Sequence, residues 1–354
     1  MNRKSAGASS PRRDFMKSAL AASSLAAVAG LAGPSLVWGA VKQVKYTPLD
    51  PVNPDILYGT TSSIWGAQHD LAFWIKRIAA LGLQGIEPYA NGIEQYRANP
   101  LVLKKLFDDA GITLIDVSNG AKGQSTNFID PDEIPKTIAD HVAFARDFLQ
   151  VFGCDHYKVN MGARPPGGPS DEQLKRLADT LNEIGRQTIA MGIRLAPHPH
   201  MWGPMEREKD MRRVMELTDP RYVWMTADLA HLELGGGDAV QIVKDYFPRI
   251  AEIHLKDTYA KYHHNNEVLT PEQHRVASLY HNLGGGGVDF PGVFQVLRER
   301  HFKGWVIFDV DGPRKGDDGF DAIGGNLDVA VDDYVAHNIN YLRDVLGVKL
   351  PPPG

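Results

Sequence analysis

Short apolar runs rich in β-branched residues alternate with longer amphipathic stretches along most of this chain. The short runs have the length and composition of buried strands, and the longer stretches repeat apolar residues every three to four positions, as surface helices do. The expected strands cover residues 56–62, 83–89, 112–118, 156–162, 193–200, 222–230, 250–257 and 304–310. The expected helices cover about 70–81, 100–110, 134–152, 170–191, 209–217, 239–246, 291–300 and 329–346.

Strand and helix units in regular succession predict a parallel sheet covered by helices. With eight units in a chain of 354 residues, we expect an α/β fold of the closed (β/α)8 TIM barrel type in a single domain. An open, doubly wound sheet is the alternative. No Gly-x-Gly-x-x-Gly sequence follows the first strand, so nothing favours dinucleotide binding.

The two ends of the chain differ in character from the expected barrel. Residues 1–39 contain the pair Arg12 and Arg13 and then an Ala-rich run, which predicts a twin-arginine signal peptide and a periplasmic or exported protein. The alternative is a membrane-tethering helix, although the run is short and small-residued for a span. Residues 40–55 predict an extended N-terminal arm, 56–312 the barrel, and 313–354 a C-terminal extension whose helix packs on the barrel.

Charge and cysteine content exclude several classes of function. The whole chain has a net charge of −5, and residues 1–39 hold five basic residues and one acidic residue, so removing them makes the protein more acidic. An acidic chain without basic runs is a poor nucleic-acid binder, and we expect no membrane association once the signal is removed. The single cysteine, Cys154, excludes an intramolecular disulfide and a Cys-based zinc site. Assembly into a homo-oligomer stays open.

Polar residues end four consecutive expected strands, and barrels build their sites from these ends. His198, Asp228, His254 and Asp309 stand there, and two imidazoles with two carboxylates suit one divalent metal ion. A cation would also compensate the carboxylate of Asp228 inside the barrel. Taken singly, each residue has a plainer role: a core histidine at 254, a turn cap at 228, or an ion pair of Asp309 with Lys256.

Other polar residues at the same end of the barrel are candidates for substrate chemistry. Asp309, His231, Glu87 and His200 are candidate catalytic groups, although Glu87 would equally serve as a buried salt-bridge partner. The candidate substrate-binding residues are Asn160, Arg164 and Lys256. The long loop after the strand at 250–257 carries histidines and tyrosines that could cap a pocket.

Four stretches resemble the xylose isomerase-like TIM barrels, a group of sugar phosphate isomerases and epimerases. They are "AALGLQGIEPY", "MTADLAHLELGGGD", "RIAEIHLKDT" and "GGGGVDFPGVFQVLRERHFKGWVIFDVDGP", and the resemblance covers about residues 56–312. The family's usual metal ligands are Glu, Asp, His and Glu on strands five to eight. Asp228 and His254 match this pattern, whereas His198 and Asp309 stand where the two glutamates are expected. Fewer carboxylates favour Mn²⁺, with Zn²⁺, Fe²⁺ or Co²⁺ as alternatives, over Mg²⁺.

The resemblance implies a divalent-metal-dependent isomerase or epimerase that acts on a sugar or keto-sugar through a metal-stabilised enediolate. In the epimerases of this group the two glutamates pass a proton between the faces of the substrate, which requires two bases. Their replacement motivates an alternative, an exported lyase or dehydratase that acts on 3-keto-glycosides or cyclitols through the same enolate. A non-catalytic carbohydrate-binding barrel is a third reading, and the acidic chain argues against a DNA-repair phosphodiesterase.

Overall fold

The computed structural model describes residues 45–62, 70–264, 269–276, 279–309 and 327–352. The chain divides into two units, Met1–Ala40 and Val41–Gly354, and all described residues belong to the second. The predicted export signal, with Arg12 and Arg13, lies outside the described residues.

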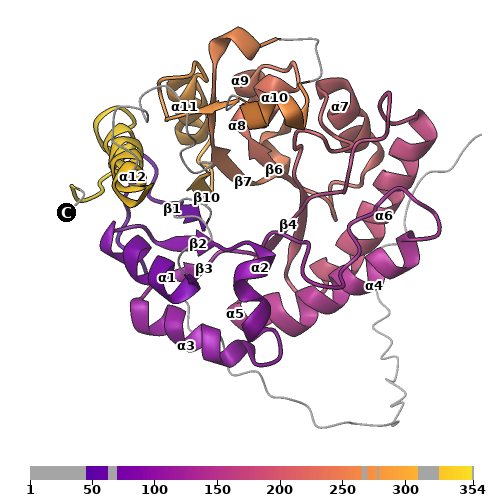
Figure 1. The fold of residues 1–354 in the computed structure, drawn as a ribbon, viewed down its shortest axis with the longest axis horizontal. Helices are drawn as coiled ribbons and strands as arrows, with labels where there is room; N and C mark the ends of the chain where they lie inside the picture. The colour runs from indigo at the N-terminus through magenta and orange to yellow at the C-terminus, as the bar shows by residue number, and fades with distance from the viewer. Residues whose placement is uncertain (1–44, 63–69, 265–268, 277–278, 310–326, 353–354) are drawn as a thin grey trace, which may run out of the picture. The chain divides into compact units, whose positions relative to one another are not determined.

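Eight parallel strands surround the centre of the second unit (Figure 1). Each lies inside one of the expected strands and is shorter than the expected range. The strands are β1 (Ile56–Thr61), β2 (Gly85–Glu87), β3 (Thr113–Leu114), β4 (His156–Val159), β5 (Arg194–Pro197), β6 (Met225–Asp228), β7 (Ile250–Leu255) and β10 (Gly304–Phe308).

The order of the strands is that of a TIM barrel, but the hydrogen-bonded ladder is not closed. Six strands form one sheet in the order β3-β2-β1-β10-β7-β6, and β4 and β5 form a second. A single bridge between Leu195 and Val223 links β5 to the segment just before β6. On the other side, the backbone N–H of Lys158 donates to the carboxylate of Asp116 at 2.7 Å. The predicted barrel fold is therefore confirmed. Between the 112–118 segment and β4, however, a hydrogen bond to the side chain of Asp116 replaces part of the expected backbone ladder.

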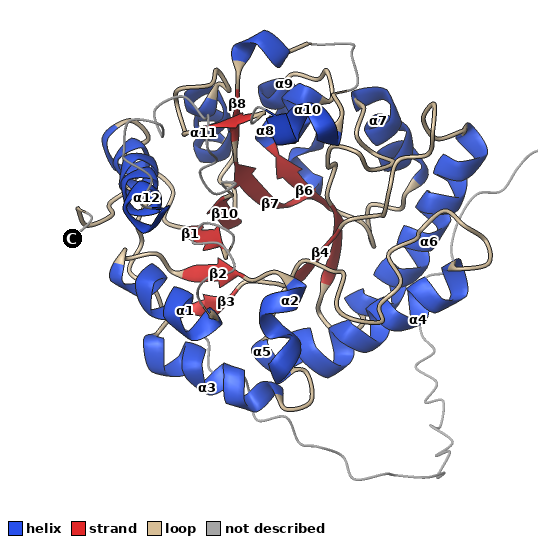
Figure 2. Ribbon diagram, in the orientation of Figure 1, coloured by secondary structure: helices blue, strands red, loops and turns tan. Residues whose placement is uncertain are grey.

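Helices cover the outside of the ring of strands (Figure 2). Every expected helix is present, and the one predicted over 134–152 comprises α4 and α5 joined by a π-helical turn, Ala145–Leu149. The helices are α1 (Leu71–Ala80), α2 (Ala90–Ile93), α3 (Pro100–Ala110), α4 (Ile134–Phe144), α5 (Gln150–Phe152), α6 (Asp171–Ile189), α7 (Glu208–Leu217), α8 (Leu229–Leu234), α9 (Ala239–Tyr246), α10 (Pro271–Val276), α11 (Phe290–Glu299) and α12 (Leu327–Asp344).

Two local features show why these residues form these elements. The strand expected over 222–230 stops at Asp228, because its side chain accepts the backbone N–H of His231 at 3.1 Å and starts α8 instead. Helix α6 approaches the segment just before β6 so closely that a Cβ at Gly185 would collide with the carbonyl of Tyr222. Only glycine fits there.

The long loop after β7 folds into an antiparallel hairpin of β8 (Asp257–Thr258) and β9 (Tyr280–His281). The carboxylate of Asp257 organises it by accepting backbone N–H groups of the glycine-rich run, at 2.8 Å from Gly284 and 3.0 Å from Gly286. Because β8 follows β7 directly, the hairpin brings Tyr280 to the rim of the barrel, where it lines a pocket.

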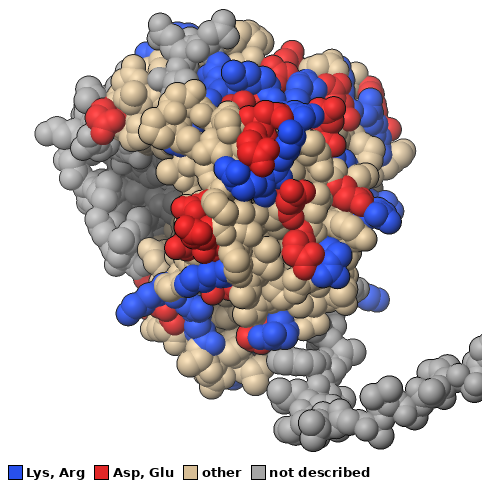
Figure 3. Space-filling view, turned by 90° about the vertical axis from the view of Figure 1, so that its right-hand side faces the viewer, with Lys and Arg blue, Asp and Glu red and all other residues tan. Residues whose placement is uncertain are grey.

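The surface carries acidic and basic side chains side by side. On the face in Figure 3 they are interspersed. Arg213, for example, lies 2.9 Å from both Asp171 and Glu216. Among the described helices, none is long and apolar enough to cross a membrane.

Candidate metal centre and pocket

The carboxyl ends of β5, β6 and β7 bring His198, Asp228 and His254 together in the barrel. Asp228 is paired with His254 across the β6–β7 ladder, so both side chains face the interior at one level. Asp228 Oδ2 lies 3.6 Å from His198 Nε2 and 3.7 Å from His254 Nδ1. All three side chains are buried, and one ligand atom from each lies within 4.8 Å of the others, so the group could hold a metal ion.

The unpaired atoms of this cluster fit a divalent cation. Asp228 Oδ2 and His198 Nε2 have no hydrogen-bond partner among the described residues, and a buried polar atom without a partner is costly. Ligand atoms at about 2.1 Å from a tetrahedral ion lie about 3.4 Å apart, close to the observed separations. A cation between them would satisfy both atoms at once.

The hydrogen bond on the side of each ring that faces away from Asp228 determines which nitrogen of His198 and of His254 keeps its proton. His198 Nδ1 lies 3.0 Å from the amide oxygen of Asn160, and His254 Nε2 lies 2.6 Å from a carboxylate oxygen of Glu252. Because these oxygens only accept, each imidazole donates its N–H to them. The other nitrogen of each ring, Nε2 of His198 and Nδ1 of His254, then faces the cluster. Burial and Lys158 oppose protonation of His254, but Glu252 and Glu87 outweigh them and raise its pKa, so Nδ1 gives up a proton when a metal binds.

His231 presents a proton to the same space instead of a lone pair. Its Nε2 lies 3.8 Å from Asp228 Oδ2, but its Nδ1 accepts the backbone N–H of Met201 at 3.2 Å. Burial holds the pKa of His231 well below its ordinary value, so the ring is neutral and its one proton sits on Nε2. This tautomer makes His231 a hydrogen-bond donor and a poor ligand.

Asp309, at the end of β10, lies beside the cluster but outside the three-residue group. Its Oδ2 is 3.3 Å from His254 Nδ1 and 3.4 Å from Lys256 Nζ, and its Oδ1 accepts the hydroxyl of Thr61 at 3.1 Å. Burial opposes ionisation of Asp309, but Lys256 and His254 outweigh it and hold its pKa well below the ordinary value. Burial raises the pKa of Asp228, because its charge is unfavourable there without a cation.

A cavity of about 250 Å³ opens directly above this cluster. It is therefore reached from the carboxyl ends of the strands, where barrel enzymes bind their substrates. The lining residues are Tyr89, Ser118, Lys158, Asn160, His198, His200, Trp202, Lys256, His274, Tyr280 and Asp309.

Three of the other predicted site residues line this cavity. The ring of His200 lies on that of His231, with centroids 3.9 Å apart. Asn160 orients His198, as described above. The ammonium of Lys256 lies 4.3 Å from the centre of the Tyr280 ring and next to Asp309, so it faces both the aromatic and the acidic side of the cavity.

Glu87 and Arg164 lie outside the cavity wall. Glu87 is buried below it, forms an ion pair with Lys158 and lies 3.0 Å from His254 Nε2. The structure thus shows the salt-bridge role that the sequence left open for this residue. Arg164 is 3.0 Å from the carboxylate of Asp210 on α7. Its role in substrate binding stays a prediction.

Sequence reasoning missed several residues of the site, among them Tyr89, Ser118, Lys158 and Trp202 in the cavity wall and Glu252 behind His254. Lys158 and Glu252 alternate with predicted site residues, Asn160 and His254, so strand periodicity places all four on the inner face. The signal in the sequence was the charge of Lys158 and Glu252 inside strands that were predicted to be buried. Trp202 gave none, because its place in the wall depends on a left-handed backbone with φ of 63°.

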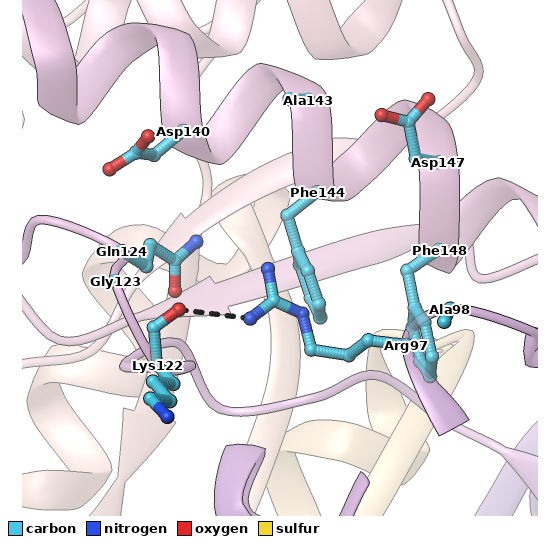
Figure 4. Close-up of a pocket in the computed structure, with 10 residues that line it drawn as sticks. All are labelled: Arg97, Ala98, Lys122, Gly123, Gln124, Asp140, Ala143, Phe144, Asp147 and Phe148. Atoms are coloured by element: carbon cyan, nitrogen blue, oxygen red, sulfur yellow. Dashed lines mark hydrogen bonds between the residues drawn. The ribbon is translucent and has the colours of Figure 1, made fainter. Parts of the chain in front are cut away.

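A larger groove of about 440 Å³ lies on the side of the barrel, along α4 and the π-helical turn (Figure 4). There the Arg97 guanidinium lies over the ring of Phe144 and donates to the carbonyl of Lys122 at 3.0 Å. Asp140 is paired with Lys136. These charged groups of the groove therefore already have partners. Among the described residues that line it, none offers unpaired atoms that converge on one point, as those at the strand ends do.

Stability is expected to fall as pH rises because of a buried histidine below the cluster. His156 lies 2.7 Å from both Glu252 and Asp155. Burial opposes protonation of His156, but these carboxylates outweigh it and raise its pKa well above the ordinary value. The stabilisation is therefore complete below about pH 6.5, the pKa of an exposed histidine, and is lost as pH rises through the folded-state pKa.

Thermal unfolding of metal-free protein, followed from about pH 6 to about pH 9, measures this slope. We expect His156→Gln to be less stable and to have a flatter pH profile than the wild type. His141→Gln is the control, since burial lowers the pKa of His141 to about 4 and the ring is neutral throughout this range. An unchanged slope in His156→Gln would contradict the assignment.

Taken together, the chain is a TIM barrel in which a buried His–Asp–His cluster that could hold a metal ion lies beneath a polar cavity at the carboxyl ends of the strands. The sequence profile of the xylose isomerase-like TIM barrel family matches residues 75–344. The chain belongs to this family.

Sequence relatives of this chain include proteins named inosose dehydratase. The chain is similar to inosose dehydratase from Bacillus anthracis, with 24% identity over 266 residues that cover 70% of this chain and 84% of the relative. With inosose dehydratase from Clostridium botulinum the identity is 25% over 251 residues, covering 67% and 80%.

Solved structures confirm the fold. The zinc-bound IolI protein gives a TM-score of 0.63 at 14% identity, covering 82% of this chain and 100% of that chain. D-psicose 3-epimerase gives 0.61 at 18% identity, covering 82% and 99%. The 3-keto-D-glucoside 4-epimerase from E. coli gives 0.59 at 17% identity, covering 79% and 98%.

Proposed function

We propose that this protein is a divalent-metal-dependent lyase or dehydratase that acts on a keto-sugar or a cyclitol ketone. The sequence relatives named as inosose dehydratases support this class of substrate. The cavity of about 250 Å³ supports a small one, since it lies below the roughly 300–1,000 Å³ of pockets for drug-sized ligands. It has room for a single ring with its hydroxyl groups.

His198, Asp228 and His254 would hold the ion. Two imidazoles and one carboxylate favour Mn²⁺, Zn²⁺, Fe²⁺ or Co²⁺ over Mg²⁺. When bound, the ion polarises the carbonyl of the substrate and acidifies the neighbouring C–H bond.

The number of carboxylates that line the cavity is the reason for proposing an elimination reaction. Asp309 is the only carboxylate among the described residues that line it, and the ammonium of Lys256, at 3.4 Å, favours the ionised form that a base requires. It removes the proton next to the carbonyl, and the electron pair forms the enolate. The C–O bond one carbon further then breaks, its electron pair leaves with the oxygen, and Asp309 returns the proton to that oxygen on the same face. His231 donates its Nε2–H to a substrate oxygen, and one carboxylate suffices.

An isomerase or epimerase is the second candidate, because the cationic side chain of Lys158 lines the cavity on the side opposite Asp309. In the order of strands around the barrel, β4 with Lys158 lies across from β10 with Asp309. Lys158 is paired with Glu87. Two groups on opposite sides could exchange a proton between the faces of a substrate carbon.

Incubation with inososes and 3-keto-glucosides in deuterated water, with Mn²⁺ or with a chelator, tests the proposal. We expect metal-dependent release of water or of the aglycone, with an unsaturated ketone as product. Formation of a deuterated stereoisomer without release would identify an epimerase. Absence of both release and exchange in the metal-loaded protein would contradict either reading.

Trp202 is expected to contribute to substrate affinity through its ring face. Its Nε1–H is already taken by the carbonyl of Leu269 at 2.8 Å, and its strained left-handed backbone, φ of 63°, is typical of a functional position. Trp202→Ala should raise KM about 3- to 10-fold, the effect of losing one ring contact, with kcat little changed. Trp202→Phe keeps a ring and should recover most of the affinity. A Phe variant as weak as the Ala variant would show that the indole N–H matters instead.

A further inference from the structure

Below the metal cluster, the interior of the barrel holds charged side chains where branched aliphatic residues are usual. Glu252 precedes His254 by two residues on β7, so both face inward, and His156 faces inward from β4. All three are completely buried. The catalytic chemistry proposed above uses neither Glu252 nor His156.

These residues form one continuous chain of hydrogen bonds. Glu252 accepts from His254 Nε2 at 2.6 Å with one carboxylate oxygen and lies 2.7 Å from His156 Nε2 with the other. His156 Nδ1 is 2.7 Å from Asp155, which accepts from Arg194 at 2.8 Å. The side chain of Asp155 is 57% exposed, so the chain runs from the cluster to solvent at the amino ends of the strands.

We propose that Glu252 is a positioning residue for the metal ion. It fixes His254 in the tautomer and the orientation that direct Nδ1 at Asp228, and His156 fixes Glu252 in turn. Because each carboxylate oxygen is held by a different imidazole, the carboxylate cannot rotate without losing a bond. A carboxylate behind a ligating histidine also strengthens that histidine as a ligand.

A purely structural role gives a weaker account of the same contacts. Burying charges is expensive, and well-packed apolar residues of similar size are often as stable or more stable. The chain of contacts ends on a cluster residue, and Glu252 contacts the ring nitrogen opposite the one that faces Asp228. This inference rests on the proposed metal site, and it concerns residues that the substrate does not reach.

Metal affinity of the full-length protein tests the proposal. Dissociation constants for Zn²⁺ and Co²⁺ would be measured by competition with a chelator, together with thermal unfolding of the metal-free proteins. We expect Glu252→Gln to bind both metals 10- to 100-fold more weakly, the usual effect of losing such a partner. The visible spectrum of the Co²⁺ protein should shift as well. Glu252→Asp keeps the charge and should lose less affinity.

Asp50→Asn is the matched control. Asp50 is also buried, accepts from the hydroxyl of Tyr58 at 2.9 Å and pairs with Arg298 at 2.9 Å, but contacts none of the cluster residues. It should lower stability and leave metal affinity unchanged.

Four outcomes decide the matter. Weaker binding in Glu252→Gln with normal binding in Asp50→Asn supports the proposal. Wild-type affinity and spectrum in folded Glu252→Gln overturn it, even if Asp228→Asn abolishes binding and the metal site stands. If the wild type binds no metal, the proposed function and this inference both fail. If Glu252→Gln does not fold, unchanged affinity and spectrum in Glu252→Asp overturn the proposal, and a loss of affinity supports it.

Discussion

Asp228→Asn should abolish metal binding while leaving the barrel folded. The carboxylate is the central member of the cluster, with Oδ2 at 3.6 Å from His198 Nε2 and 3.7 Å from His254 Nδ1. An amide cannot supply the negative charge, and its NH2 group would face the unpaired nitrogen of His198. The oxygen that caps α8 through the backbone N–H of His231 is kept. Metal content after dialysis should fall to background, and turnover with it.

The same substitution should leave the metal-free protein as stable as the wild type, or more stable. Burial raises the pKa of Asp228 because its charge is unfavourable there without a cation. Unfolding in the presence of a chelator measures this. Asp238→Asn is a matched control, because Asp238 caps α9 in the same way, by accepting the backbone N–H of Gln241 at 2.8 Å, at an exposed position. Full metal content in Asp228→Asn would contradict the account, as would metal loss in Asp238→Asn.

Asp309→Asn is expected to remove catalysis and to spare metal binding. Asp309 contacts His254 and Lys256 but lies outside the three-residue cluster. Loss of a general base typically lowers kcat by about 10²–10⁴, and we expect metal affinity to stay within about tenfold of wild type, a change of about 1.4 kcal/mol.

The two aspartate variants should therefore separate cleanly in kcat and in metal affinity. If Asp309→Asn loses the metal as completely as Asp228→Asn does, Asp309 is a fourth ligand and the base lies elsewhere. If it keeps full turnover, Asp309 takes no part in the chemistry.

Strand and helix periodicity predicted most of the fold because each buried strand and each amphipathic helix leaves its own pattern in the sequence. The gap in the ladder left no such pattern. It depends on Asp116, whose carboxylate takes the backbone N–H of Lys158 that a neighbouring strand would otherwise accept. The early end of β6 had a local signal in Asp228, a residue type that caps helices as readily as it ends strands.

For the site, the sequence placed His198, Asp228 and His254 at one end of the barrel because strand ends converge there. Which nitrogen of each ring carries the proton depends on partners far along the chain, such as Asn160 and the backbone of Met201. Periodicity alone cannot supply these partners.

The most direct test of the central claim is the anomalous scattering of crystals grown with Mn²⁺. We expect one strong peak in the barrel, within bonding distance of His198 Nε2, Asp228 Oδ2 and His254 Nδ1. A Mn²⁺-saturated crystal with no peak between these three atoms, or with the ion bound by other side chains, would contradict it.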